Sequence, residues 1–258
     1  MADTAPGASA VAVRTFEVQV RLAELGPGPH ALKTISAHCA MDDATVSRVL
    51  AAGIYKRIFR RTARGMYELA RPLSELAYAL PHGPPREDAA AALWELRAAT
   101  DGGLALLYLK APGLVTARQC SEMAVGDSDL TELGMSARDV LAVTRSLRTG
   151  ASGRVILAYL PPALQAQVLD EPVPDEAGPG VIRDRDALAA SLDTIREVGY
   201  GLGHQECMAG WNSIAAPVFD GDSIVASVLL LRPALQMQRA PASYIRATEK
   251  AAAALSST

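Results

Sequence analysis

A cluster of structure-breaking residues divides this chain at the point where the sign of its charge changes. Pro72 and the run PHGPP at 81–85 form the densest group of prolines and glycines in the first half of the sequence. Residues 1–71 carry ten Lys and Arg against six Asp and Glu, a net charge of +4, whereas residues 72–258 carry fifteen against twenty-two, a net charge of −7. We therefore expect two modules joined by a linker at 72–85.

The excess of cations in the smaller module indicates a partner that carries many negative charges. The whole chain is acidic, with a formal net charge of −3, yet five cations fall within ten positions: Lys56, Arg57, Arg60, Arg61 and Arg64. A basic module attached to an acidic one is typical of a protein whose first part alone contacts a polyanion. A solvated charged surface is the alternative interpretation of the same charges.

The composition indicates an ordinary folded protein without an export signal. Half of the residues are apolar and 21% are charged, which is typical of globular chains. The three cysteines, Cys39, Cys120 and Cys207, are odd in number, so they cannot all pair within the chain. The N-terminus has no basic segment followed by an apolar one, and no run of about 18 apolar residues occurs. We expect a cytoplasmic protein that contacts no membrane.

The first module is predicted to be three helices followed by a hairpin. Residues 11–25 fit a helical stripe and also alternate as a strand does, and their length favours a helix. A short helix follows at 31–39, and Asp42 or Asp43 can cap a third helix. The runs KRIF and GMYEL on either side of RRTAR predict two short strands joined by a basic tip. This order of elements is a winged helix-turn-helix in outline.

The third predicted helix, at about 43–53, has one apolar face and one face suited to close approach. At about 100° per residue, four positions gather on the apolar side: Val46, Val49, Leu50 and Gly53. The opposite side holds small residues around one long cation: Ala44, Ser47, Arg48 and Ala51, with Thr45 at its edge. Such a face can approach a groove closely.

The larger module mixes strands and helices, which predicts an α+β domain. Helices are expected at 86–100, from about 152, at 187–199 and at 242–257. Residues 103–110 form an apolar run typical of a buried strand, and 212–231 form a hairpin with Asp220-Gly221 as the turn signal. The breaker-rich stretch 170–180 predicts a long surface loop.

Three segments of the chain resemble the IclR family of bacterial transcription regulators. They are residues 45–70, the run TGASGRVILAYLP at 149–161 and the run at 197–233, of which the last is the most specific. In that family a Gly-Tyr pair, acidic residues, a glycine and the run Ile-Ala-Ala-Pro-Val-Phe-Asp follow in order. Their counterparts here are Gly199-Tyr200, Glu206, Gly210 and residues 214–220.

The resemblance implies a regulator rather than an enzyme, with no cofactor, no metal and no catalytic residue. It implies a winged helix-turn-helix at 8–71 that binds double-stranded operator DNA, a linker helix within 72–85, and a GAF-like domain at 86–258. The GAF-like domain binds a small-molecule effector, and members act as homodimers or tetramers. By position, Arg48 matches the recognition-helix arginine of the family, and Tyr67-Glu68-Leu69 matches the closing strand of the wing.

The side chains of the first module suit these roles. Arg48 can donate a bidentate pair to guanine or hold a phosphate, while Thr45 and Ser47 can bond to a phosphate or a base edge. The wing cations supply sequence-independent attraction that weakens as salt rises, and they are Lys56, Arg57, Arg60, Arg61 and Arg64.

Two departures from the family affect the path from recognition helix to wing. Gly53 stands where relatives usually have a leucine on the buried side, and Arg57 stands where they have the glycine that opens the wing. A glycine there removes packing and costs roughly 1 kcal/mol of helix propensity. We therefore expect the recognition helix to end early or to be loosely held.

The effector site departs further. Pockets for small carboxylates in this family draw on the turn before the GASGR helix, a position after Gly-Tyr, a polar residue before Ala-Ala, and two serines on the last strand. The corresponding residues here are Ala151, Ser152, Gly203 or His204, Ser213, Leu229 and Leu231. Because both serine positions are leucines, a carboxylate would lose its donors, at a cost of several kcal/mol. We expect a more apolar ligand, or a closed pocket that binds nothing.

Other interpretations use the same residues differently. The first is a protein that keeps the family fold but has lost ligand control, acting as a ligand-independent regulator or scaffold. The more remote one is a serine hydrolase using Ser152 and His204, although GASG places its second glycine one residue too early for a nucleophile elbow. We expect Ser152 to cap the following helix instead. His204, Glu206 and Cys207 match no usual zinc spacing.

Overall fold

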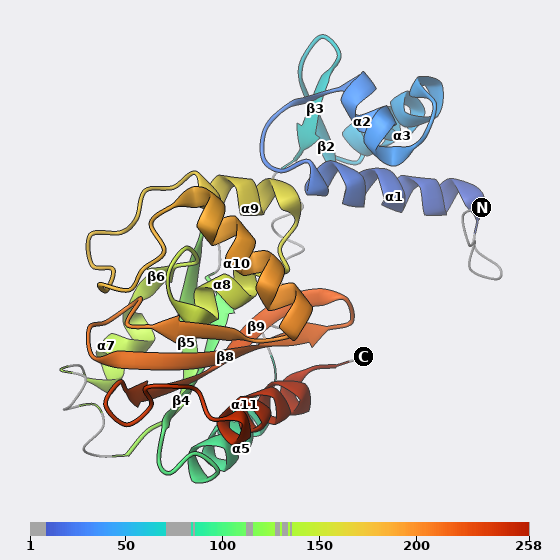
Figure 1. Cartoon of the computed structure of the whole chain (residues 1–258). Coiled ribbons are helices and arrows are strands. Elements are labelled where there is room, and N and C mark those ends of the chain that lie inside the picture. The colour runs from blue at the N-terminus through green and yellow to red at the C-terminus, as the bar shows by residue number, and fades with distance from the viewer. Residues whose placement is uncertain are drawn as a thin grey trace. The chain divides into compact units, whose positions relative to one another are not determined.

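The computed structural model describes residues 9–70, 84, 86–111, 116–126, 130, 134 and 136–257, and these fall into two compact units (Figure 1). The chain divides close to residue 81. Apart from Pro84, the predicted linker at 72–85 and its helix lie outside the described residues. None of the described helices is both long enough and apolar enough to cross a membrane.

The N-terminal unit is a winged helix-turn-helix. Its helices are α1 (Ala10–Glu24), α2 (Leu32–Cys39) and α3 (Asp43–Tyr55), and its strands are β1 (His30–Ala31), β2 (Phe59–Ala63) and β3 (Met66–Leu69). The three strands form a small antiparallel sheet in the order β1-β3-β2. The predicted helix at 11–25 is confirmed. The core of the unit is formed by Val18, Leu22, Ile35, Val46, Leu50 and Phe59, all nearly inaccessible to solvent.

Local capping positions α3, the helix predicted to be the recognition helix. The carboxylate of Asp42 accepts a hydrogen bond from the backbone N–H of Thr45 at 2.8 Å, which satisfies one of the unpaired donors in the first turn. The same bond, with a second from the Thr45 side chain, lowers the pKa of the Asp42 carboxyl. Of the two candidate caps, Asp42 is therefore the one used. Val46, Val49, Leu50 and Gly53 are buried, as the helical periodicity predicts.

Gly53 has a packing role that the local sequence pattern does not reveal. The expectation that it ends the recognition helix early is wrong, because α3 continues to Tyr55. A Cβ atom added to Gly53 would lie 2.1 Å from Cδ2 of Phe59, and Phe59 is only 3% exposed. The wing phenylalanine occupies the space that a larger side chain would fill. The missing packing at Gly53 is thus supplied from β2.

The C-terminal unit is built on a six-stranded antiparallel sheet in the order β6-β5-β4-β9-β8-β7. The strands are β4 (Leu104–Lys110), β5 (Ala117–Ala124), β6 (Thr144–Ser146), β7 (Gly201–His204), β8 (Trp211–Asp220) and β9 (Ser223–Pro233). The helices are α5 (Arg86–Ala98), α7 (Ala137–Ala142), α8 (Gly150–Ala158), α9 (Pro162–Leu169), α10 (Arg185–Val198) and α11 (Ala242–Leu255). This curled sheet with its helices is the GAF-like α+β fold that the resemblance implies.

Helices cover both faces of this sheet (Figure 1). α5 and α11 pack on one face, and α8, with α10 behind it, packs on the other. Successive residues of β4 therefore point into different cores, with Leu106 on the α8 side and Leu107 on the α5 side. Because both faces are buried, β4 appears in the sequence as an unbroken apolar run rather than as an alternation.

Two local predictions for this unit need correction. Helix α8 begins at Gly150 rather than near 152, and its N-cap is Thr149, so Ser152 lies inside the helix and does not cap it. The tight turn between β8 and β9 consists of Gly221 and Asp222, one residue later than the predicted turn signal. The stop of α10 at Gly199 is confirmed, since this residue adopts the left-handed conformation with φ 84°.

Candidate functional site

The exposed face of α3 carries the predicted recognition residues. Arg48 is exposed, and its guanidinium lies along its own helix, donating from Nε to the Ala44 carbonyl and from Nη2 to Oγ1 of Thr45, both at 3.3 Å. Ser47 is half-buried beside it. These weak intrahelical bonds hold Arg48 over a surface of small residues. Such bonds are easily exchanged for bonds to another acceptor.

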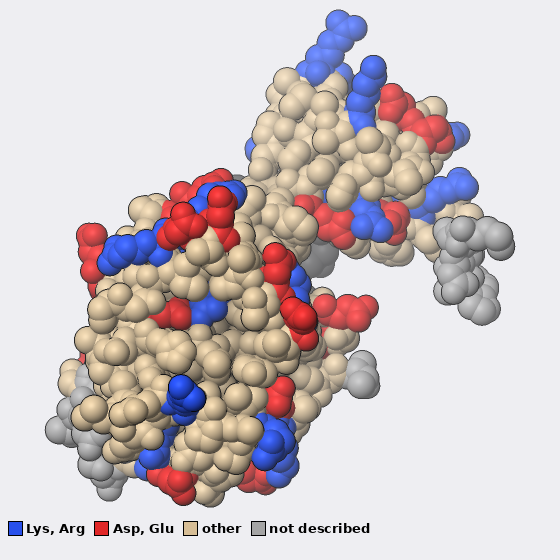
Figure 2. All heavy atoms as spheres, viewed as in Figure 1, with Lys and Arg blue, Asp and Glu red and all other residues tan. Residues whose placement is uncertain are grey.

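The cations of the wing differ in position from the prediction. Arg60 and Arg61 belong to β2 itself, and the turn of the hairpin comes later, at Arg64 and Gly65. Lys56 and Arg57 lie in the turn between α3 and β2. All five cations are exposed, and Figure 2 shows Lys and Arg side chains projecting into solvent from the N-terminal unit.

The wing cations also differ in their partners. Arg60 is bonded to the carboxylate of Glu68, directly opposite it on β3, so much of its charge is compensated within the wing. Arg61 packs near the ring of Tyr67, with Cζ 6.0 Å from the ring centroid, and has no carboxylate partner among the described residues. A neutral aromatic partner leaves the positive charge of Arg61 available to an anion.

Arg57 ends the recognition helix in a conformation that favours glycine. Its φ is 61°, and its N–H donates to the Ile54 carbonyl while the N–H of Ile58 donates to the Gly53 carbonyl. This is a Schellman motif with arginine at the left-handed position. A non-glycine residue there costs about 1 kcal/mol, which explains why relatives usually have glycine at the corresponding place.

The C-terminal unit contains a pocket of about 50 Å³ on the face of the sheet covered by α8. Five of the six predicted effector residues line it: Ala151, Ser152, Ser213, Leu229 and Leu231. His204 does not line the pocket, because it lies exposed at the end of β7. Much of the lining is apolar, contributed by Leu106, Val140, Met208, Trp211, Leu229 and Leu231.

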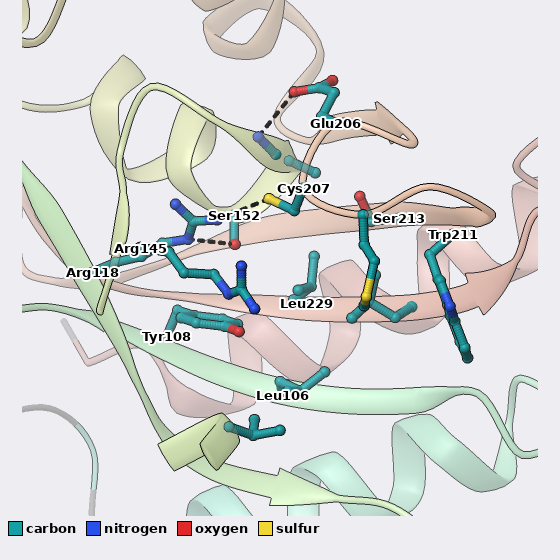
Figure 3. Close-up of a pocket in the computed structure, with 15 residues that line it drawn as sticks. Leu106, Tyr108, Arg118, Arg145, Ser152, Glu206, Cys207, Trp211, Ser213 and Leu229 are labelled. Atoms are coloured by element: carbon teal, nitrogen blue, oxygen red, sulfur yellow. Dashed lines mark hydrogen bonds between the residues drawn. The ribbon is translucent and has the colours of Figure 1, made fainter. Parts of the chain in front are cut away.

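Two arginines of the pocket were not predicted from the sequence. Arg118 on β5 and Arg145 on β6 both line it, together with Tyr108 on β4 (Figure 3). Partly exposed and buried positions alternate over residues 117–120 of β5, but the buried position at 118 holds an arginine, so the sequence carries no apolar alternation that could have identified this strand. The pocket is therefore apolar on one side and cationic on the other.

Arg118 is held rigidly although it is only 1% exposed. Its Nε donates to Oγ of Ser152 at 2.9 Å, Nη1 donates to the Ser146 carbonyl, and Nη2 lies 3.4 Å from Sγ of Cys207. A Cβ added to Gly153 would lie 2.5 Å from Nη1 of Arg118. The glycines of the GASG motif thus allow a guanidinium to pack against the first turn of α8.

Burial also sets the protonation of the groups beside Arg118. Burial raises the pKa of Tyr108 to about 12, although the positive charges of Arg118 and Arg145 act in the opposite direction. The phenol of Tyr108 therefore stays neutral and can donate a hydrogen bond at physiological pH. Burial likewise raises the pKa of Cys120 to about 12, which fits its expected role as a small core residue.

A buried ion pair fixes the rim of the pocket. Glu206 accepts from Nη2 of Arg154 at 2.6 Å, from Nε of Arg154 at 3.1 Å and from the backbone N–H of Gly150 at 3.0 Å. Both side chains are nearly inaccessible to solvent. This arrangement ties the loop before β8 to the start of α8, and the loop carries Cys207 and Met208 into the pocket.

The alternative chemistries find no support in this geometry. The hydroxyl of Ser152 is bonded to Arg118 rather than to a histidine. Glu206 is committed to Arg154, and in the described part of the chain no three His, Cys, Asp or Glu side chains gather as a metal site requires.

The comparisons with known proteins agree with this architecture. Residues 135–257 match the model of the bacterial transcriptional regulator IclR C-terminal family. The probable HTH-type transcriptional regulator ArcR of Halobacterium salinarum is 30% identical over 115 residues, which cover 44% of this chain and 43% of that protein. The match thus spans less than half of that relative.

Solved structures match over nearly the whole chain. An IclR homologue from Microbacterium hydrocarbonoxydans, crystallised with 4-hydroxybenzoate, is 20% identical with a TM-score of 0.57, covering 93% of this chain and 97% of that one. A putative IclR-family regulator from Rhodococcus sp. is 25% identical with a TM-score of 0.55, covering 99% and 97%. The Rhodococcus protein and ArcR are both described as transcriptional regulators. The C-terminal unit therefore matches the IclR family of transcriptional regulators, and the fold of nearly the whole chain is similar to that of solved IclR-family structures.

Proposed function

We propose that the protein is a sequence-specific DNA-binding transcriptional regulator whose affinity for its operator is controlled by a small molecule in the C-terminal pocket. The observation that carries the DNA-binding part is the exposed cationic wing beside a recognition helix with small residues around Arg48. In a chain of net charge −3, this surface is suited to a polyanion and to little else.

The exposed residues divide into two roles in this proposal. Arg48, helped by Thr45 and Ser47, contacts base edges in the major groove, because a guanidinium among small neighbours can reach O6 and N7 of guanine. Lys56, Arg57, Arg61 and Arg64 attract phosphates without regard to sequence. Arg60 contributes less than these four, since Glu68 already compensates its charge.

The pocket supports control by an effector. It is enclosed by side chains from β4, β5, β6, β8, β9 and α8, and the homologue from Microbacterium hydrocarbonoxydans was crystallised with a small organic acid. A homodimer on a two-fold symmetric operator is the assembly that we propose, by analogy with how winged helices bind paired half-sites. The alternative, a ligand-independent regulator or scaffold, is favoured only by the small volume of the pocket, about 50 Å³.

Selection of protein-bound fragments from the source genome, at two salt concentrations, tests the DNA-binding proposal. A preferred sequence should emerge, and it should be bound more weakly at the higher salt. On that sequence, Arg48→Ala should relax the base preference and cost about 1–3 kcal/mol of binding free energy. Recovery of no preferred sequence would refute a sequence-specific regulator.

The recovered operator then distinguishes an effector-controlled regulator from a ligand-independent one. Operator affinity is measured by fluorescence anisotropy against a library of small metabolites, with melting temperature as a parallel readout of binding. A compound that both stabilises the protein and changes operator affinity supports control by an effector. Operator binding that no compound alters would favour the ligand-independent alternative.

A further inference from the structure

Tyr55 is the most exposed large apolar side chain in the described part of the N-terminal unit. It is 81% exposed, although it belongs to the last turn of α3. Its ring lies beside Lys56, with Nζ 5.3 Å from the ring centroid, and its hydroxyl makes no hydrogen bond with any described residue. Packing within the unit therefore does not require a tyrosine at this position. Single exposed apolar residues are common, so the place of Tyr55 on the helix has to decide its role.

Tyr55 projects from the same side of α3 as Arg48. The two residues are seven positions apart, which is close to two full turns, so their directions around the helix axis differ by only about 20°. Both side chains are exposed. Along the axis they are separated by about 10.5 Å, at 1.5 Å per residue. A surface that Arg48 contacts therefore also lies in the direction of Tyr55, two turns further along.

The helix surface between these two side chains is low. Ala51 and Ala52 lie there, and both are exposed. Methyl groups do not hold a partner away from the helix, so Arg48 and Tyr55 stand above a shallow depression at either end of it. A partner that fits this face is contacted by two long side chains with little between them.

The charges around Tyr55 indicate that this partner is a polyanion. Residues 44–64 contain no Asp or Glu, and the exposed cations Lys56 and Arg57 directly follow Tyr55. Nucleic acid phosphates would be attracted to both sides of the ring. Since Lys56 and Arg57 already serve the phosphates, the ring of Tyr55 is available to a different part of the nucleic acid.

The chemistry of the ring selects one feature of the major groove. An aromatic ring edge makes apolar contacts, and thymine is the base that presents an apolar group there, its C5-methyl. Residues at the start of a recognition helix lie closest to the base edges, so at its far end only a long side chain reaches them. Tyr55 has that length. A smaller apolar residue at the same position would not.

We propose that Tyr55 is a second base-reading residue of α3, whose ring packs on the methyl group of a thymine. This inference rests on the proposed function, in which Arg48 contacts a guanine in the same groove. For a helix that lies along the groove, 10.5 Å corresponds to about three base pairs at 3.4 Å each. The thymine therefore lies about three base pairs from the guanine.

Deoxyuridine in place of thymidine tests this contact, because it removes the methyl group and keeps the base pair. Each thymine of the recovered operator half-site is replaced singly, and affinity for the full-length protein is measured by fluorescence anisotropy. One replacement, two to four base pairs from the guanine that Arg48 reads, should weaken binding about three- to fivefold. Replacement at thymines outside this range should have little effect.

Three variants assign the effect to the tyrosine ring. Tyr55→Ala should bind the thymine operator about fivefold more weakly and should no longer distinguish thymine from deoxyuridine at that position. Tyr55→Phe keeps the ring and should keep the distinction. Arg64→Ala is the matched control, since it removes an exposed wing cation and should weaken both operators alike. Sedimentation velocity and melting temperature are measured on each variant.

Three results would overturn the proposal. If Tyr55→Phe loses as much affinity as Tyr55→Ala, the hydroxyl bonds to a phosphate instead of the ring reading a base. If Tyr55→Ala still distinguishes thymine from deoxyuridine, another residue contacts the methyl group. If Tyr55→Ala changes the oligomeric state, the ring serves a protein contact. In all three cases an operator has been found, whereas recovery of no preferred sequence would refute the proposed function itself.

Discussion

The two units of this protein use arginine in opposite ways. In the N-terminal unit the cations of the wing are exposed, and among the described residues Arg61 has an aromatic neighbour and a carbonyl as its partners. In the C-terminal unit Arg118, Arg148 and Arg154 are buried and bonded to fixed acceptors. Exposed charges attract a polyanion at a distance and are weakened by salt, whereas buried charges select a partner by geometry. Position in the fold, rather than residue type, decides which anion each arginine suits.

The largest effect in this comparison is expected at the buried ion pair. Glu206→Gln leaves the charge of Arg154 buried without a counter-charge, and we expect a loss of about 3–5 kcal/mol of unfolding free energy in urea titrations. Asp193→Asn is the control, since Asp193 pairs with Arg196 on the surface of α10 and should cost less than about 0.5 kcal/mol. Similar losses of unfolding free energy in the two variants would mean that burial does not determine how much each ion pair contributes to stability.

A smaller effect is expected where the recognition helix meets the wing. Gly53→Ala places a methyl group against the ring of Phe59, and we expect a destabilisation of about 1–2 kcal/mol despite the better helix propensity of alanine. In a Phe59→Leu background the same change should be neutral or stabilising. A double-mutant cycle in urea measures this coupling. Additive effects of the two changes on the unfolding free energy would show that the Phe59 ring does not depend on the absence of a side chain at residue 53.

A still smaller effect, on operator affinity, is expected from breaking the ion pair between Arg60 and Glu68 in the wing. Glu68→Gln frees Arg60 from its partner, so operator affinity at low salt should rise roughly two- to fivefold and the salt slope should steepen by up to about one unit. Anisotropy titrations at several salt concentrations provide the measurement. In the Arg60→Ala background, Glu68→Gln should have no such effect. A gain that persists there would assign the change to Glu68 itself.

The smallest effect is expected at the left-handed residue after α3. Arg57→Gly removes backbone strain and should raise the unfolding free energy by up to about 1 kcal/mol, while weakening operator binding through the lost charge. Arg57→Ala is the matched control, because it loses the same charge but keeps a Cβ. Equal stability of the two variants would show that the conformation of residue 57 is unstrained.

Much of the fold follows from local physical chemistry, and so it could be predicted from the sequence. Asp42 caps α3, Gly199 ends α10, and the apolar run at 103–110 forms a central strand, because each depends on neighbouring residues alone. The end of α3 was predicted wrongly, since the space beside Gly53 is filled by Phe59, which comes from the next element. A residue of one element can thus fill the space that a glycine leaves in another element.

The lining of the pocket was predicted less completely, because part of it depends on contacts between elements that are far apart in the sequence. Family positions identified the residues that α8, β8 and β9 contribute, such as Ser152, Ser213 and Leu229. Arg118 and Arg145 are far apart in sequence and meet only through the pairing of β5 with β6. No local sequence pattern predicts that these two strands pair. The chemical character of the site therefore depended on tertiary structure.

The salt dependence of operator binding tests most directly whether the two sets of arginines serve different anions. The affinity of the wild-type protein, Arg61→Ala and Arg118→Gln for the recovered operator is measured at three or more salt concentrations, with no ligand added. We predict that Arg61→Ala flattens the slope of log affinity against log salt by about one unit and that Arg118→Gln leaves the slope unchanged. A flattened slope in Arg118→Gln, or an unchanged slope in Arg61→Ala, would contradict the separation of roles between exposed and buried arginines.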